Sequence, residues 1–290
     1  MNIKNELDRV ILFINDYVDK DEIVMIPVSG GIDSDVVARL CVKALGKEHV
    51  RLFLIQQDDM EEKFLVNART LATDLQVSLS EICLEGVNGT LIEALERGDK
   101  NHIFSAAHGL DKEKAKCSLR SAVISCYQDR GYLIAGTVNR TEWDLGFFLT
   151  FGDNLCHFNP IKHLYKSQVI ELARTLGTRK EVIRQEPSAG FWKGQTDRED
   201  IAYWIINGGP ILAPRDFSKE EVELAEKWKD ELSVQMVDRC LSMFRTGTEN
   251  KDISIKTGLD EKIVNGLHNL IQKAKKYKSR PVMVSLDDIR

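Results

Sequence analysis

Two hydrophobic patterns alternate along the first 135 residues of the chain. Short runs rich in apolar residues predict strands, and longer segments whose apolar residues recur every three or four positions predict helices. Such alternation indicates βαβ units, so the expected fold class is α/β, with a parallel sheet flanked by helices. We predict an opening helix around Leu7, Val10, Ile11 and Ile14, strands at 23–28, 51–55, 78–84 and 132–135, and helices at 35–45, 61–75, 91–97 and 112–127.

The pattern changes after Gly136. A loop-rich stretch runs to Pro160, and helices are expected at 166–176 and 179–184. A second loop at 185–197 precedes a mostly helical end, and the chain shows no internal repeat and no low-complexity linker. We therefore expect a single domain over residues 1–290, with the α/β core at about 20–205 and helical C-terminal additions at about 206–290.

The composition argues against several classes of protein. The 290 residues are 43% hydrophobic and 29% charged with a net charge of −5, so no overall positive field would attract nucleic acid. No apolar stretch reaches transmembrane length, and the charged start lacks the apolar core of a signal peptide. The six cysteines have no CxxC pair or metal-type spacing. We expect a cytoplasmic protein that binds neither nucleic acid nor membranes.

The most informative stretch, PVSGGIDS at 27–34, lies between a predicted strand and a predicted helix, where a parallel sheet binds ligands. Its glycines let the backbone approach a phosphate, its hydroxyls can donate to one, and the helix N-terminus offers free amides. Asp33 would repel a phosphate unless a divalent cation stood between them, which suggests Mg²⁺. A plain glycine-rich turn is the alternative, but Asp33, Ser34 and the preceding strand favour a phosphate site.

This loop has neither the Lys of a Walker A sequence nor the GxGxxG spacing of a dinucleotide fold. It resembles the SGGxDS pyrophosphate loop of N-type ATP pyrophosphatases, which implies an adenine-nucleotide alpha-hydrolase-like, Rossmann-like fold. The resemblance implies that ATP is cut between its α and β phosphates, that the AMP half passes to a substrate oxygen, and that pyrophosphate leaves. It does not identify the substrate, because GMP, asparagine and NAD synthetases share the loop.

Further stretches narrow the family. AGTVNRTEWDLGFFLTFGD at 135–153 is followed by NPI at 159–161 and LYKSQ at 164–168, and EPSAGFWKGQTD occupies 186–197. These stretches resemble ammonia-dependent NAD synthetases, and so, more weakly, do Arg51-Leu52 and QQD at 56–58. The resemblance implies a carbon–nitrogen ligase that adenylates nicotinate adenine dinucleotide with ATP and aminates it with ammonia, giving NAD, AMP and pyrophosphate.

Carried over residue by residue, this resemblance assigns roles within the site. Asp33 and Lys166 would be catalytic, and Lys166 together with a metal ion would stabilise the charge that builds up on departing pyrophosphate. The expected Mg²⁺ ligands are Asp33, Glu142 and Ser188. The expected ATP-binding residues are Ser29, Gly30, Gly31, Asp33, Ser34, Gln57, Thr137, Lys166 and Ser188, and the expected substrate-binding residues are Arg120, Asp153 and His157.

The chain departs from the family pattern on the side of the acyl substrate. His157 and Gly190 stand where the pattern has carboxylates, and an Arg-rich run is reduced at 114–120 to Arg120. The altered pattern fits an NAD synthetase with substitute contacts. It also fits a related N-type ATP pyrophosphatase that amidates a different carboxylic acid in specialised biosynthesis. A catalytically silent nucleotide-binding protein is a third alternative, which Asp33, Glu142 and Lys166 argue against.

The resemblance also implies partners. ATP, Mg²⁺, ammonia and a carboxylate substrate, nicotinate adenine dinucleotide in the leading interpretation, should bind to a homodimer, since the family builds its dinucleotide site across two subunits. The sequence begins Met1-Asn2 without an amino-terminal cysteine nucleophile, and it has no room for a nitrilase-like glutaminase. The nitrogen donor should therefore be free ammonia or the product of a separate glutaminase.

Overall fold

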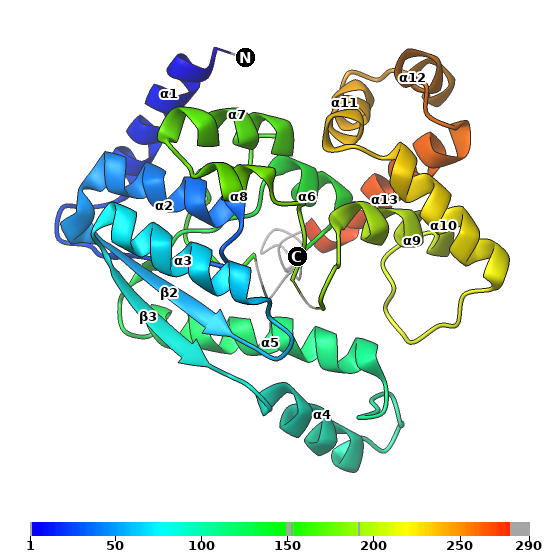
Figure 1. The fold of residues 1–290 in the computed structure, drawn as a ribbon, viewed down its shortest axis with the longest axis horizontal. Helices are drawn as coiled ribbons and strands as arrows, with labels where there is room; N and C mark the ends of the chain where they lie inside the picture. Colours follow the sequence, from blue (N-terminus) through cyan, green and yellow to red (C-terminus); the bar gives the residue numbers. More distant parts are fainter. Residues whose placement is uncertain (1, 149–151, 153, 191, 279–290) are drawn as a thin grey trace, which may run out of the picture.

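The computed structural model describes residues 2–148, 152, 154–190 and 192–278 (Figure 1). Four parallel strands form one sheet in the order β3-β2-β1-β4, so β1 lies at its centre. All four predicted strands are present and the predicted α/β fold class is confirmed. The strands are β1 Val24–Pro27, β2 Val50–Gln56, β3 Ser78–Cys83 and β4 Leu133–Ile134.

Side chains of the central strands alternate between two apolar layers. Val24 and Ile26 of β1 belong to a core built with the helices α1 Ile3–Tyr17, α2 Ile32–Leu45, α3 Glu62–Leu75 and α7 Lys166–Leu176. Met25 and Phe53 belong to a second apolar layer together with Ile124 of α5 Gly109–Gln128. Figure 1 shows α5 on the opposite side of the sheet from α2 and α3. Both faces of the sheet are therefore covered, as expected for parallel strands joined by helices.

The C-terminal helices build a core of their own. It is formed by α9 Asp197–Asn207, α10 Lys219–Glu231, α11 Val234–Arg245, α12 Asn250–Thr257 and α13 Glu261–Lys278. Leu145 of the short helix α6 Arg140–Leu145 is also part of this core. This second core includes residues of α6 and α9, which come before residue 206 in the chain. The predicted boundary near residue 206 stays a prediction.

The remaining elements are short or lie at the periphery. They are the 3₁₀ turn η1 Lys47–His49, α4 Val87–Gly98 and α8 Lys180–Arg184. The predicted loop-rich stretch after Gly136 contains α6, and α2 begins at Ile32, three residues before its predicted start. Within the described part of the chain, none of the helices combines the length and the apolar character needed to cross a bilayer.

The loop after β1 depends on a glycine that no other residue can replace without strain. Gly30 has φ +76°, and a Cβ there would lie 2.1 Å from the carbonyl oxygen of Phe64 in α3. The Gly30 carbonyl in turn accepts a hydrogen bond from the Asn67 side chain at 3.0 Å. Close packing of the loop against α3 thus fixes the backbone of the predicted phosphate site.

Gly30→Ala should therefore destabilise the fold more than the same change at Gly258, which has φ +75° but no atom within 4 Å of its added Cβ. Gly258→Ala should cost about 1–2 kcal/mol from the left-handed backbone alone. Gly30→Ala should cost about 1–3 kcal/mol more, because of the added overlap. Guanidinium unfolding of both variants measures the difference, and equal losses would contradict the packing argument.

Candidate active site

Three chain segments converge at one edge of the sheet. Residues 28–31 follow β1, Gln57 follows β2, and residues 135–139 follow β4. Since these strands are parallel, their carboxyl ends meet at the same edge, where open α/β sheets bind ligands. The strand register therefore brings together three of the segments that the sequence singles out.

Hydroxyl groups of the loop after β1 form hydrogen bonds with the backbone of the same loop. The Ser29 backbone N–H donates to Ser34 Oγ at 3.2 Å, and the Gly31 N–H donates to Ser29 Oγ at 3.3 Å. Ser34 Oγ donates to the Gly31 carbonyl oxygen at 3.1 Å. The loop leads into α2, whose N-cap Gly31 makes no side-chain cap, so the first amides of a 14-residue helix are available for an anion.

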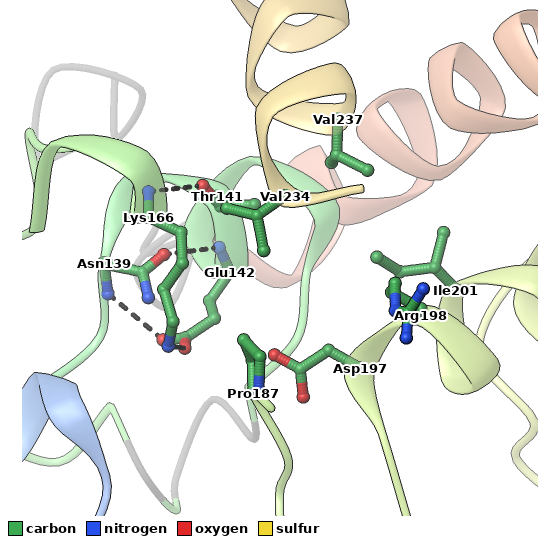
Figure 2. Close-up of a pocket in the computed structure, with 10 residues that line it drawn as sticks. All are labelled: Asn139, Thr141, Glu142, Lys166, Pro187, Asp197, Arg198, Ile201, Val234 and Val237. Atoms are coloured by element: carbon green, nitrogen blue, oxygen red, sulfur yellow. Dashed lines mark hydrogen bonds and ion pairs between the residues drawn. The ribbon is translucent and has the colours of Figure 1, made fainter. Parts of the chain in front are cut away.

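An ammonium group lies among carboxylates beside this loop. Lys166 Nζ donates to Asp33 Oδ2 and lies 3.7 Å from Glu142 Oε1. The other Asp33 oxygen, Oδ1, accepts from the buried Asn139 Nδ2 at 3.0 Å. Figure 2 shows Lys166 extending from its helix toward the carboxylate of Glu142. Asp33 of α2 therefore meets side chains of α6 and α7 that come more than 100 residues later in the sequence.

Local sequence explains where Glu142 and Lys166 point. Asn139 caps α6 in a capping box: its side chain accepts from the Glu142 N–H at 3.0 Å, and Glu142 Oε2 accepts from the Asn139 N–H at 3.1 Å. Lys166 is the first residue of α7, and its N–H donates to Thr141 Oγ1 at 2.9 Å. Glu142 thus has one oxygen committed to the cap while the other faces Lys166.

Burial and the neighbouring charges shift the pKa values of the groups in this cluster. Burial opposes the charge of Lys166, but Asp33, Glu142 and Asp197 outweigh it and raise the pKa of the ammonium. Burial and the charge of Asp33 raise the pKa of Glu142 to about 8, although Lys166 lowers it. Burial also raises the pKa of Asp197, again against the effect of Lys166. One ammonium among three carboxylates leaves the cluster short of positive charge.

A small cavity opens beside this cluster. It encloses about 30 Å³ and is lined by Lys166, Glu142 and Asp197 together with apolar side chains, among them Ile201 and Val237 (Figure 2). That volume holds about one water-sized molecule and is far too small for a nucleotide. The cavity is therefore a small compartment at the charged end of the site, closed on one side by the C-terminal helices.

Asn139 and Asp197 were not among the predicted site residues. Asn139 could have been found from the spacing Asn139-x-x-Glu142, which is a helix-capping signal that also fixes Glu142. Asp197 ends the 186–197 stretch, and it lines the cavity because α9 begins there. No local pattern in the sequence indicates that Asp197 faces Lys166.

Two predicted residues of different roles lie in contact. Gln57, expected at adenosine, is buried and donates to the Lys116 carbonyl oxygen at 3.0 Å. Arg120, expected at the acyl substrate, donates from Nε to Gln57 Oε1 at 2.7 Å. The Lys116 side chain is also buried, and its Nζ lies 2.9 Å from Glu113 Oε2. The middle of α5, around Lys116 and Arg120, therefore lies at the same edge of the sheet as Gln57.

The other predicted residues lie in different surroundings. His157 is exposed, and its Nδ1 accepts from the Ile134 N–H of β4 at 2.9 Å. Ser188 follows Pro187 of the cavity wall, and its Oγ accepts from the Gly190 N–H at 3.0 Å. Thr137 is partly exposed after β4, and Asp153 lies outside the described residues. Among the described residues, the hydrogen bonds of His157 and those of Asp33 thus involve different partners.

The donor set suits a hard cation. Asp33 and Glu142 offer carboxylate oxygens, and Mg²⁺ binds to one or two protein carboxylates together with substrate phosphates. Among the described residues, no group of three or more His, Cys, Asp or Glu side chains is arranged as a complete metal site. Lys166 lies between the two carboxylates instead. The residues fit a cation that is completed by the phosphates of a nucleotide rather than by protein alone.

The raised pKa of Glu142 makes stability depend on pH. The folded state holds this proton more tightly than the unfolded state, so stability falls as pH rises from 4.5 toward 8. Glu142→Gln removes that loss: in metal-free buffer above pH 8 the variant should be more stable than wild type by at least about 1 kcal/mol, with no gain near pH 4. Guanidinium titrations at both pH values test this. The same change at the exposed Glu93 serves as control, and a gain independent of pH would contradict the prediction.

Comparison with known proteins identifies the family. The NAD synthase family model matches residues 6–229. The NH(3)-dependent NAD(+) synthetase of Archaeoglobus fulgidus is 31% identical over 250 residues, which cover 82% of this chain and 93% of that protein. Among solved structures, an NMN synthetase from Francisella tularensis has a TM-score of 0.74 at 21% identity, covering 99% of this chain and all of the other.

A second structure agrees. The NH3-dependent NAD synthetase from Campylobacter jejuni has a TM-score of 0.69 at 23% identity and covers 98% of this chain and all of its own. These structural likenesses support the fold, while the family model spans most of the chain and includes the loop after β1, α6 and α7. The chain therefore belongs to the NAD synthase family, as its sequence motifs predict.

Proposed function

We propose that this chain, a carbon–nitrogen ligase of the NAD synthase family, converts nicotinate adenine dinucleotide to NAD with ATP and ammonia. The observation that carries the proposal is the contact of Lys166 with Asp33 and Glu142 beside the loop Ser29–Ser34. A site that only binds a nucleotide has no need of a buried ammonium among carboxylates at the end of a phosphate loop. A site that expels pyrophosphate does, because negative charge builds up there.

The first step joins the substrate to AMP. A carboxylate oxygen of the substrate attacks the α-phosphorus of ATP, the bond from that phosphorus to the bridging oxygen breaks, and pyrophosphate leaves with the electron pair. The substrate carboxylate is already ionised, so no general base is required. The loop amides, the α2 N-terminus and Lys166 would receive the phosphate charge.

The second step forms the amide. Ammonia attacks the acyl carbon, the bond to AMP breaks, and the proton released from nitrogen passes to solvent or AMP. Water must be kept from the acyl-adenylate, and the apolar wall of the cavity beside Lys166 supports such exclusion. The similar protein of Archaeoglobus fulgidus is an NH(3)-dependent NAD(+) synthetase, so we propose free ammonia, or ammonia from a separate glutaminase, as the donor.

Magnesium completes the proposal. Asp33 and Glu142 would hold Mg²⁺, with Ser188 as a further ligand near the phosphates, and the ion would neutralise phosphate charge when bound. Binding of the ion would also relieve the repulsion between Glu142 and Asp33 that helps to raise the pKa of Glu142. We further propose that Ser29, Gly30, Gly31, Ser34, Gln57 and Thr137 bind ATP, that Arg120, Asp153 and His157 bind the acyl substrate, and that the enzyme is a homodimer.

Pyrophosphate release should require ATP, Mg²⁺ and nicotinate adenine dinucleotide together, and NAD should form when ammonium is added. Asp33→Ala should lower release by a factor of about 10² or more, because it removes a metal ligand and the partner of Lys166. The exposed Asp8→Ala on α1 serves as control, and circular dichroism checks folding. Near-normal turnover in the Asp33 variant would remove the metal role. Turnover with another acid alone would favour the alternative, a related ligase for a different carboxylate.

The altered acyl side can be tested by restoring both carboxylates. His157→Asp combined with Gly190→Asp should lower the KM for nicotinate adenine dinucleotide by about tenfold and leave the KM for ATP unchanged, if unpaired substrate donors now weaken binding. Asp is among the residues that tolerate the left-handed backbone at Gly190, φ +69°. Loss of activity in the double variant would indicate a different acid substrate. The mononucleotide acid should be assayed beside the dinucleotide, because NMN synthetase is among the structural neighbours.

A further inference from the structure

A buried carboxylate outside the predicted site touches both helices that carry the cluster. Asp238 lies on α11 in the C-terminal part, beyond the residues that the family model matches, and it is only 5% exposed. Its Oδ1 accepts from Thr141 Oγ1 of α6 at 2.5 Å, and its Oδ2 accepts from the Ser167 N–H of α7 at 2.7 Å. One side chain thus joins α6 to α7 from a third helix.

The bonded neighbours of Asp238 adjoin the reactive groups. Thr141 precedes Glu142, and Ser167 follows Lys166. Thr141 Oγ1 donates to Asp238 and also accepts from the Lys166 N–H at 2.9 Å; Figure 2 draws the second of these bonds. The first two amides of α7 therefore donate to one connected network.

Charge favours the same arrangement. The positive end of α7 faces the Asp238 carboxylate, which supplies the negative charge that a helix N-terminus prefers. Burial raises the pKa of Asp238, while the hydrogen bonds from Thr141 and Ser167 lower it. The free-energy cost of burying a carboxylate here is offset by these hydrogen bonds and by the charge of Lys166, so loss of one bond should be costly.

We propose that Asp238 is a positioning residue for adenylation: it fixes the first turn of α7 against α6, and so holds Lys166 between Asp33 and Glu142. The inference rests on the proposed function of Lys166 and extends it to the C-terminal helices. Val234 and Val237 of α11 also line the cavity beside Lys166 (Figure 2). The helix that carries Asp238 therefore also forms part of the wall of this cavity.

Asp238→Asn tests the proposal with the least change in shape. The amide has a single oxygen, so it can accept from Thr141 or from the Ser167 N–H but not from both at once. A displacement near 1 Å costs about 10²-fold in rate, so kcat for pyrophosphate release should fall about 10- to 100-fold. The KM values for ATP and the acid should change less than about threefold, because the contacts that bind both substrates before the reaction remain. Asp252→Asn in the first turn of α12 is the matched control and should leave both parameters unchanged.

Two further variants guard against a folding defect. Thr141→Val removes the hydroxyl while keeping the shape and should lower kcat as Asp238→Asn does, whereas Thr141→Ser keeps the hydroxyl and should retain most of the rate. In a Lys166→Ala background, Asp238→Asn should cause little additional loss, because its effect acts through Lys166. All assays are run well below each variant's unfolding midpoint. An unchanged kcat in Asp238→Asn, or the same fold-loss with and without Lys166, would overturn the proposal.

A readout independent of activity separates this inference from the proposed function. Amide hydrogen exchange at residues 167–169 should accelerate by about tenfold or more in Asp238→Asn, relative to wild type and to Asp252→Asn. Unaltered exchange there would show that Asp238 does not hold the turn. If wild type releases no pyrophosphate with any acid while exchange responds as expected, the proposed function fails and the positioning contact stands.

Discussion

A buried ammonium in contact with carboxylates holds the site of this protein together. Lys166 reaches Asp33 and Glu142 from a helix that begins 133 residues after Asp33 in the sequence. Removing one partner of such a pair leaves an uncompensated charge in a poorly solvated place, at a typical cost of about 3–5 kcal/mol. Three elements are thereby constrained at once: the start of α2, the capped helix α6 and the first turn of α7.

The parallel sheet makes this convergence possible. Strands that run in one direction deliver the phosphate loop, Gln57 and Asn139 to the same edge, and both faces of the sheet are filled by helices. The helices on one face also fix α7, because its residues Val169, Leu172 and Ala173 are buried in the larger core. Lys166 is the first residue of this helix, so its position is fixed with it. Apolar packing thus fixes the positions of the charged side chains, and these charged side chains determine the chemistry of the site.

Much of this arrangement follows from local sequence. The four strands, the helices between them and the glycine-rich loop could be predicted because hydrophobic period and turn residues are local signals. Helix α6 was not predicted, since six residues carry too little periodicity and its start depends on a capping box. The family motifs indicated Asp33, Glu142 and Lys166, and the structure brings these three together.

What could not be predicted depends on contacts between distant segments. Asp197 and Asp238 reach Lys166 and its neighbours through the docking of α9 and α11, which no pattern within those helices reveals. The position of His157 was equally hidden: the motif gives its place in the sequence, but its bond to the Ile134 N–H comes from pairing with the end of β4. Spatial roles of this kind require the tertiary fold.

Helix α6 makes the site depend on the C-terminal helices. Its capping residue Asn139 bonds to Asp33, while Leu145 at its other end is buried among helices that are synthesised up to 125 residues later. The capping box orients Glu142 locally, but the position of α6 as a whole also depends on the burial of Leu145 among those later helices. The arrangement of Asp33, Glu142 and Lys166 therefore depends on the packing of the C-terminal helices as well as on the sheet.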